Sequence, residues 1–390
     1  MSRSKPSVYL TFADPPNGIF KTQVVDVVEL LKANTDARVT LISFISFRGF
    51  FNSRKTIKSW CNDAIVLPMI PLIKNWRLNS IFLRLALSRI GKSATLLGRG
   101  VFATNLLIQT FRMNDRVVYD GRGAIWAEAK EFNVYGSALT VEEVKKLEQQ
   151  AILKSDWLIS VSQKLVEYWS EYYDYHGSNY SVIPCSFKKN GTTESLNVLT
   201  ELEWSKEDLI FVYAGSNDGW QGMRQLKALF THLLNLGKNT RLLLLMKNED
   251  LSNELSKSFP NQVARVWLKP ELVSSYLAVG DYGILIRPEN ITNQVASPVK
   301  FAEYLSVGLK VLISSGVGDY SEFVRKHNVG HQINNLSDLD DLEFVKNEQK
   351  EEIKNLKWQA AKNEIELNKL KSQLNPHFIF NSMNSIRALV

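Results

Sequence analysis

The 390-residue sequence predicts an α/β protein built on parallel sheets, and three observations support this class. Short runs rich in β-branched and aromatic residues alternate with helical stretches, a pattern typical of parallel sheets covered by helices. Apolar residues make up 45% and charged residues 22% of the chain, as in globular domains. The chain is also too long for one ordinary hydrophobic core, so two domains are expected.

The first half, residues 1–185, is expected to form one Rossmann-like domain. Its predicted strands are Val8–Phe12, Val39–Phe44, Ala64–Leu67, Ala94–Leu97, Arg116–Tyr119, Trp157–Val161 and Ser181–Pro184. Apolar residues at helical spacing over 24–31 predict a helix after the first strand. Thr140 and Glu143 form a capping box, which predicts the start of a helix that runs through Leu153.

Residues 186–344 repeat the alternation after a polar linker and are expected to form a second Rossmann-like domain. Predicted strands are Leu209–Ala214, Arg241–Met246, Gln262–Leu268, Tyr282–Ile286 and Lys310–Ile313, with helices at about 221–237, 250–258, 298–307 and 319–328. Ser297 is the expected N-cap and Pro298 the first residue of the third helix. Ligands of such sheets bind beyond the carboxyl ends of the strands, so we expect the site in a cleft between the domains.

The stretch 286–319 gathers residue types suited to a nucleoside diphosphate that carries a sugar. Free N–H groups at the start of the 298–307 helix favour an anion. Lys300 in the first turn adds a full charge for a phosphate, and Arg287 ends the preceding strand. Glu303 lies three residues after Lys300 on the same helix face, where its carboxylate can accept hydrogen bonds from ribose hydroxyls.

The segment IRPENITNQVASPVKFAEYLSVGLKVLISSGVGD resembles the donor-binding region of GT-B glycosyltransferases, especially family 4-like members with the pattern S-P-x-K-x-x-E-Y. VYAGS at 212–216 resembles the glycine-containing loop of the donor domain, which adds Gly215 and Ser216 to the donor site. DGRG at 120–123 and GRG at 98–100 resemble segments that line the acceptor side. The acceptor-side candidates are Gly18, Arg99, Asp120, Arg122 and Glu128.

The resemblance implies transfer of a sugar from a UDP-, GDP- or ADP-sugar to a cell-envelope or membrane-associated acceptor, either a glycan or a lipid-linked molecule. It implies no metal ion or other cofactor, and retention of the anomeric configuration. Lys300 and Arg287 would be catalytic by holding the departing diphosphate, and Glu303 would hold the ribose. The sequence departs from the family at Val295, which replaces the first of two glutamates, so a binding protein with a degenerate site is an alternative.

The net charge of +7 is concentrated in residues 38–112, where twelve Lys or Arg residues accompany one acid, Asp63. Within this window, residues 71–92 predict an amphipathic helix with Leu78, Ile81, Leu85 and Ile90 near one face. Both an ordinary helix of a basic protein and a surface helix attracted to anionic lipid fit this pattern. Nucleic acid is not an expected partner, because no recognisable binding motif accompanies the charge.

Cys61 and Cys185 lie far apart without metal-ligating neighbours, which predicts two reduced thiols and no metal site. The sequence has no run of 18 or more uncharged apolar residues, and its first residues lack the long apolar stretch of a secretory signal. We therefore expect a cytoplasmic protein. Peripheral contact with the inner face of the membrane through residues 38–112 is a further hypothesis.

Residues 345–390 differ in composition and are expected to form a third module. A heptad seam predicts a coiled coil and a homodimer; its residues are Ile353, Leu356, Ala360, Leu367, Leu370 and Leu374. LNPHFIFNSMNSI at 374–386 resembles the phosphoacceptor box of LytS-type sensor histidine kinases, which implies His377 as the phosphoacceptor.

Because the kinase's ATP-binding domain is missing from this sequence, we expect no self-phosphorylation and interpret the junction near 344–352 as a gene fusion or a fragment boundary. The alternative function is two-component signalling, with the transferase-like part as an input module.

Overall fold

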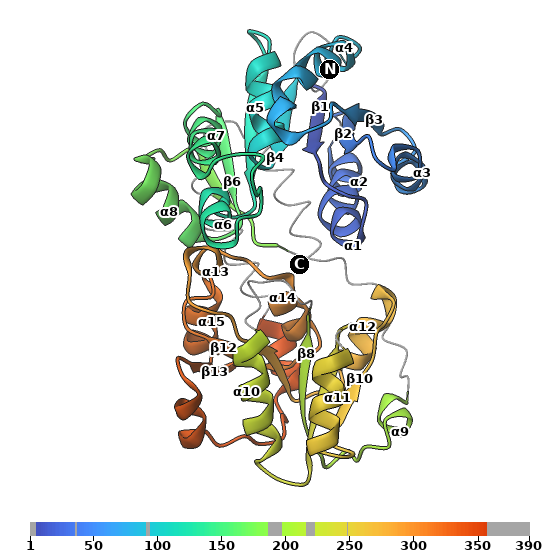
Figure 1. Cartoon of the computed structure of the whole chain (residues 1–390), viewed down its shortest axis with the longest axis vertical. Helices are drawn as coiled ribbons and strands as arrows, with labels where there is room; N and C mark the ends of the chain where they lie inside the picture. Colours follow the sequence, from blue (N-terminus) through green and yellow to red (C-terminus); the bar gives the residue numbers. More distant parts are fainter. Residues whose placement is uncertain are drawn as a thin grey trace. The chain divides into compact units, whose positions relative to one another are not determined.

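The structure is a computed structural model that describes residues 5–35, 37–90, 94–185, 197–215, 223–247 and 249–356. The described chain forms two compact units, which divide between Lys188 and Lys189. Each unit is a parallel sheet with helices packed around it (Figure 1). The predicted class, α/β with two Rossmann-like domains, is therefore confirmed.

The first unit holds a seven-stranded sheet in the order β3-β2-β1-β4-β5-β6-β7. Its strands are β1 (Ser7–Phe12), β2 (Val39–Ser46), β3 (Ile65–Met69), β4 (Thr95–Arg99), β5 (Arg116–Gly121), β6 (Trp157–Ser160) and β7 (Tyr180–Val182). All six residues of β1 and seven of the eight in β2 are buried, as expected of a sheet covered on both faces. Strand order reverses between β1 and β4, which makes this the topological switch point of the sheet.

Eight α-helices accompany this sheet in the described residues: α1 (Gly18–Phe20), α2 (Asp26–Asn34), α3 (Phe50–Trp60), α4 (Ser80–Leu87), α5 (Gly100–Thr110), α6 (Ile125–Phe132), α7 (Val141–Leu153) and α8 (Gln163–Tyr173). The helix predicted over 24–31 is α2 together with a π-helical segment, Lys21–Val25, that precedes it. The capping box of Thr140 and Glu143 at the start of α7 is confirmed.

The predicted amphipathic helix over 71–92 is shorter than expected and buries a different face. It consists of a 3₁₀ segment, η2 (Ile73–Asn79), followed by α4. Leu78, Ile81 and Leu85 are 52%, 61% and 61% exposed. The buried contacts come instead from Trp76, Leu83 and Leu87, and α4 packs against α5. The apolar face that the spacing singles out therefore lies on the surface.

The second unit holds a six-stranded sheet in the order β10-β9-β8-β11-β12-β13. Its strands are β8 (Leu209–Ala214), β9 (Thr240–Leu245), β10 (Val263–Arg265), β11 (Tyr282–Leu285), β12 (Lys310–Ser314) and β13 (Gly330–Ile333). Its described helices are α9 (Val198–Glu201), α10 (Met223–Leu234), α11 (Glu249–Ser258), α12 (Pro270–Leu277), α13 (Ile291–Gln294), α14 (Val299–Ser306), α15 (Tyr320–His327) and the 3₁₀ helix η4 (Leu336–Asp341). The switch point of this sheet lies between β8 and β11.

The start of α14 corrects one prediction. Pro298 is the N-cap and Val299 the first helical residue, so Ser297 is not the cap and Pro298 is not inside the helix. The Ser297 hydroxyl instead lies 2.7 Å from the Tyr320 hydroxyl. Tyr320 is held there because its ring stacks on Phe301, with the ring centroids 4.1 Å apart.

Residues 345–356 pack onto the second unit. Lys346 Nζ lies 2.9 Å from a carboxylate oxygen of Asp281, and the Asn347 amide donates to the Gly308 carbonyl at 2.7 Å. Ile353 is 3% exposed in the core, with Leu356 packed beside it. Two residues of the predicted heptad seam therefore contact the second unit. Residues 357–390, including His377, lie outside the described residues, so the coiled coil, the dimer and the phosphoacceptor stay predictions.

Candidate functional site

Tyr304 of α14 bridges the two strands that flank the switch point of the second sheet. Its hydroxyl accepts a hydrogen bond from the Ala214 amide at the end of β8 and donates one to the Ile284 carbonyl in β11, both at 3.1 Å. The helix is thereby fastened across the two strands whose carboxyl ends flank the expected ligand position. Tyr304 is not among the predicted donor-site residues, although it is the tyrosine of the S-P-x-K-x-x-E-Y pattern.

Gly215, Tyr213 and Lys300 lie together at this edge. A Cβ atom on Gly215 would stand 2.2 Å from the Tyr213 hydroxyl, so only glycine fits without displacing the tyrosine. Lys300 Nζ lies 5.2 Å from the centroid of the Tyr213 ring, within the range of a cation–π contact. The structure thus brings together two of the predicted donor residues. A third, Ser216, lies outside the described residues.

Arg287 is a half-buried cation that follows β11. Its Nη1 atom donates to Asn293 Oδ1 at 3.1 Å, while the Nε atom is buried and has no hydrogen-bond partner among the residues that the structure describes. Burial lowers the pKa of Arg287 to about 10, and the groups that oppose this shift are Tyr213 and Tyr304 rather than a carboxylate. A guanidinium that is partly removed from water, with no carboxylate partner in the described part of the chain, is costly, and an anionic ligand would neutralise it.

The remaining predicted donor residues differ in burial. Ser297 and Pro298 are buried, so they shape the turn before α14, whereas Lys300 and Glu303 are partly exposed. Val295 stands where the resemblance implied the first of two glutamates, and it is only 3% exposed. A glutamate in the same conformation would bury its charge, which gives a physical reason for the apolar residue.

Two further residues at the same edge were missed by the sequence analysis. Lys247 follows β9, and Trp267 lies two residues beyond the end of β10. Lys247 Nζ lies 4.8 Å from the centroid of the indole ring, and Trp267 remains 59% exposed. The prediction placed Trp267 inside a strand over Gln262–Leu268, whereas β10 ends at Arg265. An exposed indole backed by a cation offers a flat stacking surface.

The switch point of the first sheet carries a network of opposite charges. Arg99 ends β4 and lies 3.6 Å from the carboxylate of Asp14, which follows β1. Asp120 in β5 accepts a hydrogen bond from the Tyr9 hydroxyl at 2.5 Å, and Arg122 Nε lies 2.9 Å from its other oxygen. The predicted residues Arg99, Asp120 and Arg122 are therefore brought together. Asp14 and Tyr9 were not predicted.

The cations of this network have carboxylate neighbours. Burial acts to lower the pKa of Arg122, but the neighbouring Asp120 more than offsets it and holds the pKa above its ordinary value. Arg99 Nη1 lies 3.9 Å from Asp120, too far for a hydrogen bond, and this buried atom has no hydrogen-bond partner within the described ranges. A ligand could therefore accept a hydrogen bond from this donor of Arg99 without breaking an existing one.

Glu128, in the first turn of α6, belongs to a separate cluster. Burial, with help from Glu148 and Glu131, raises the pKa of Glu128 to about 7. Glu148 accepts hydrogen bonds from two backbone amides at 2.9 Å and from the Tyr173 hydroxyl at 2.6 Å. A Cβ atom on Gly123 would lie 2.5 Å from a Glu128 oxygen, so Gly123 lets the carboxylate approach the DGRG loop.

Gly18 opens α1 on the same carboxyl edge of the first sheet, following β1. A Cβ atom at this position would meet nothing within 4 Å. Open space therefore surrounds this predicted acceptor-side residue, and no steric demand explains the glycine.

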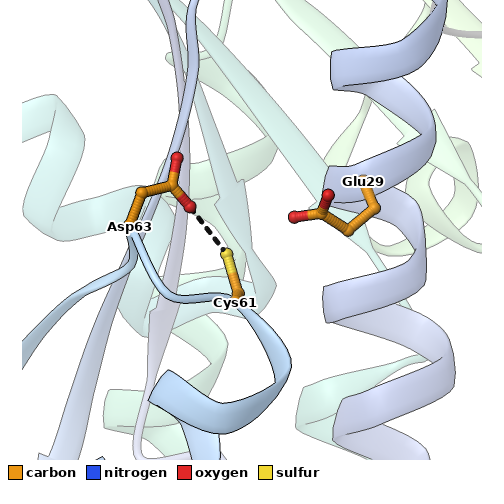
Figure 2. Close-up of side chains that lie close together, drawn as sticks. All are labelled: Glu29, Cys61 and Asp63. Atoms are coloured by element: carbon orange, nitrogen blue, oxygen red, sulfur yellow. Dashed lines mark hydrogen bonds between the residues drawn. The ribbon is translucent and has the colours of Figure 1, made fainter.

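A third cluster joins Glu29 of α2 with Cys61 and Asp63, whose ligand atoms lie within 4.8 Å of one another (Figure 2). Lys32 Nζ takes the central position, 2.8 Å from Glu29 and 2.7 Å from Asp63. Burial and the hydrogen bond to Asp63 raise the pKa of Cys61 to about 12, so it is a thiol. We interpret these residues as an ion-pair cluster that ties α2 to the turn before β3.

Two family models match parts of the chain. Residues 226–369 match the model described as glucosyltransferase 3-like, C-terminal domain. Residues 365–390 match the histidine kinase model, and this segment contains His377. The curated proteins gave no match.

Solved structures match nearly the whole chain. WaaG, a glycosyltransferase involved in lipopolysaccharide biosynthesis, is 14% identical with a TM-score of 0.59, over 98% of this chain and 94% of that one. HepE of Anabaena, solved in complex with UDP, is 12% identical with a TM-score of 0.57, over 98% and 95%. A UDP-N-acetylglucosamine 2-epimerase is 12% identical with a TM-score of 0.50, over 96% and 92%.

At these identities the likeness establishes the fold, and both transferases and an epimerase share it. The resemblance predicted from the donor-site segment is confirmed at this level. The chain has the two-domain GT-B fold, and in its second unit it matches the C-terminal domain of glucosyltransferase 3-like proteins.

Proposed function

We propose that the protein is a glycosyltransferase that moves a sugar from a nucleoside-diphosphate sugar to a cell-envelope acceptor. The donor would bind at the β8–β11 switch point of the second unit. One observation carries this proposal: Arg287 is a half-buried cation whose buried Nε has no hydrogen-bond partner among the described residues, and no carboxylate is among the groups that shift its pKa. A diphosphate would supply the missing negative charge.

Each residue of this edge has a role in the proposal. Arg287 and Lys300 neutralise the diphosphate, helped by the N–H groups at the start of α14. Glu303 accepts hydrogen bonds from the ribose. The base stacks on Trp267, whose exposed ring stands at the same edge of the sheet.

The reaction breaks the bond between the sugar's anomeric carbon and the diphosphate oxygen, and forms a bond from that carbon to an acceptor oxygen. Negative charge develops on the departing diphosphate, so fixed cations beside it stabilise the transition state more than the ground state. Arg287 and Lys300 would do this without a divalent cation. The acceptor's hydroxyl proton leaves with a diphosphate oxygen, and retention of configuration is part of the proposal.

The acceptor would bind at the carboxyl edge of the first sheet. Gly18 and Arg99 flank its switch point, while Asp120 and Arg122 hold Arg99 in a network with carboxylate partners. Such an edge suits hydroxyl groups of a glycan, because they can both donate and accept hydrogen bonds. Glu128, with a pKa of about 7, is the acceptor-side group whose charge changes near neutral pH.

We further propose that the protein contacts the cytoplasmic face of a membrane through residues 38–112. The described helices include none that is long and apolar enough to cross a bilayer. Leu78, Ile81 and Leu85 are nevertheless more than half exposed, and cations surround them in the sequence. Exposed apolar side chains among cations are typical of helices that lie at an anionic membrane surface. A lipid-linked acceptor would be reached from this position.

The test is nucleotide binding, measured as a rise in melting temperature with UDP, GDP or ADP. A ligand that binds only the folded state raises the melting temperature by mass action. Lys300→Ala should lose most of the rise, whereas Lys326→Ala, an exposed lysine on α15, should keep it. If none of the three nucleotides shifts the wild type, the donor site is wrong. Transfer to an acceptor, rather than release of an epimerised sugar, then separates a transferase from an epimerase.

A second candidate function is phosphorelay signalling, favoured by the histidine kinase match over residues 365–390. Incubation with a cognate kinase and labelled ATP should label His377 and leave His377→Gln unlabelled. Equal labelling of both proteins would exclude His377 as the phosphoacceptor.

A further inference from the structure

A groove of about 550 Å³ lies in the first unit between the end of α4 and the end of α5. Its walls include Arg84, Leu87 and Ser88 on one side and Gln109, Phe111 and Arg112 on the other. Helix α5 starts at the carboxyl end of β4 and runs back along the sheet, so its last residues lie at the opposite edge. Figure 1 shows α4 at one end of this unit and α1, which follows β1, at the other. The groove is therefore separate from the proposed acceptor edge.

The two arginines of the groove differ in their partners. Arg112 is paired with Asp115, with Nε 2.9 Å from the carboxylate. Arg84 donates from Nη2 to the Gln109 carbonyl at 3.2 Å, and within the described ranges no carboxylate forms an ion pair with it. A guanidinium carries five N–H donors, so this bond positions Arg84 and leaves donors for an oxyanion. The groove therefore has a net positive charge.

Large exposed apolar side chains lie close in sequence to the residues that line the groove. On α4, Ile81 and Leu85 lie one turn apart and are each 61% exposed. Beyond α5, Phe111 is 52% and Met113 is 95% exposed. Exposed apolar residues on the helix and the loop that also supply the groove's cations match a membrane interface, where apolar side chains enter the acyl region and cations remain at headgroup level.

We propose that this groove binds the phosphate of an anionic phospholipid, with Arg84 as its main ligand and Ile81, Leu85, Phe111 and Met113 inserted beside the acyl chains. The inference rests on the proposed membrane contact and adds an anchoring lipid that is distinct from the sugar acceptor. Charge complementarity supports this occupant, because residues 38–112 hold twelve cations and one acid. The bound lipid would lay η2 and α4 along the membrane.

The test is sedimentation of the full chain with vesicles of phosphatidylcholine alone or mixed with phosphatidylglycerol. Wild type should bind only the mixed vesicles. Arg84→Gln should weaken binding about fiftyfold, because it removes both a charge and charge-assisted hydrogen bonds to phosphate. Arg89→Gln, a neighbouring exposed arginine outside the groove lining, should cost only the about fivefold expected for one surface cation. Leu85→Ser should also weaken binding without unfolding the protein, since its side chain is exposed.

Three results would overturn the proposal. If the wild type does not bind vesicles with phosphatidylglycerol, the site does not exist. If Arg84→Gln and Arg89→Gln lose equal vesicle affinity, the attraction is diffuse and does not depend on the groove. Competition by millimolar glycerol phosphate would identify a site for free phosphate instead of a lipid. Donor binding is scored separately: Arg84→Gln should keep the nucleotide-induced rise in melting temperature, and Lys300→Ala should still bind vesicles. Failure of one claim is thus distinguishable from failure of the other.

Discussion

The two sheets end in switch points with opposite charge arrangements. At the first, Arg99 and Arg122 face the carboxylates of Asp14 and Asp120 within 2.9 to 3.9 Å. At the second, Arg287 lies half-buried beside tyrosines and an asparagine, and no carboxylate among the described residues forms an ion pair with it. A cation that already has its counter-ion is part of the scaffold, whereas one without it is suited to an anionic ligand. The comparison assigns the charged donor to the second unit and a hydroxylated acceptor to the first.

The largest expected effect is on catalysis at the second switch point. Arg287→Met should lower the rate of sugar transfer by about a hundredfold to a thousandfold, as expected when one preorganised charge-stabilising group is removed. The nucleotide-free protein should lose little stability, because the variant also removes the cost of a half-buried cation that has no carboxylate beside it in the described residues. Steady-state kinetics and urea unfolding measure the two quantities. Normal kinetics in this variant would refute the role of Arg287.

The first switch point should show the reverse pattern. Asp120→Asn removes the buried counter-charge of Arg122, so the free energy of unfolding should fall by about 3 kcal/mol. The nucleotide-induced rise in melting temperature should remain. Urea unfolding with and without UDP checks both parts. A variant that unfolds like wild type but no longer responds to UDP would invert the assignment of the two edges.

A pH dependence should distinguish Glu128 from the ion pairs. Its pKa is raised from 4.5 to about 7, so the folded state holds this proton over a pH range in which the unfolded state has released it. Stability from this group is therefore complete below about pH 4.5 and is lost as the pH rises through 7, by roughly 3 kcal/mol. Glu128→Gln should flatten that part of the stability curve. An unchanged slope between pH 5 and 8 in the variant would show that Glu128 titrates normally.

The smallest effect concerns the donor's base. Trp267→Ala should weaken nucleotide affinity about tenfold, the value of one stacking contact of roughly 1.4 kcal/mol. Folding stability should not change, since the ring is 59% exposed. Calorimetric titration with UDP measures the affinity, and Phe at this position should restore most of it. Equal affinities of wild type and the alanine variant would exclude stacking on Trp267.

The sequence predicts the parallel sheets well, because strands such as Leu209–Ala214 are buried on both faces and read as apolar runs. It misses β13, whose residues 330–333 include only one fully buried side chain, Ile333. It also shifts the start of α14, since the contact of Ser297 with Tyr320 joins residues 23 positions apart. A contact between residues so far apart leaves no recognisable pattern in the local sequence.

The candidate site was predictable in part. Lys300 and Arg287 are predicted from their residue types and from their positions at a helix start and a strand end. The family resemblance adds Gly215 and the DGRG loop. The unpartnered Nε of Arg287, the Tyr304 bridge and the Trp267–Lys247 contact depend on packing between separate strands. The sequence does not decide whether Leu78 is buried, for a related reason. The 71–92 segment has two apolar faces, and the tertiary contacts with α5 determine which of them is buried.

The most direct test of the donor site is amide hydrogen exchange of the full chain with and without UDP. The account predicts slower exchange in 209–215 and 285–304 of the second unit, where Gly215, Arg287 and Lys300 lie. The strands of the first unit should exchange at unchanged rates. Protection confined to the first unit, or protection of 285–304 that survives in both Lys300→Ala and Arg287→Met, would contradict it.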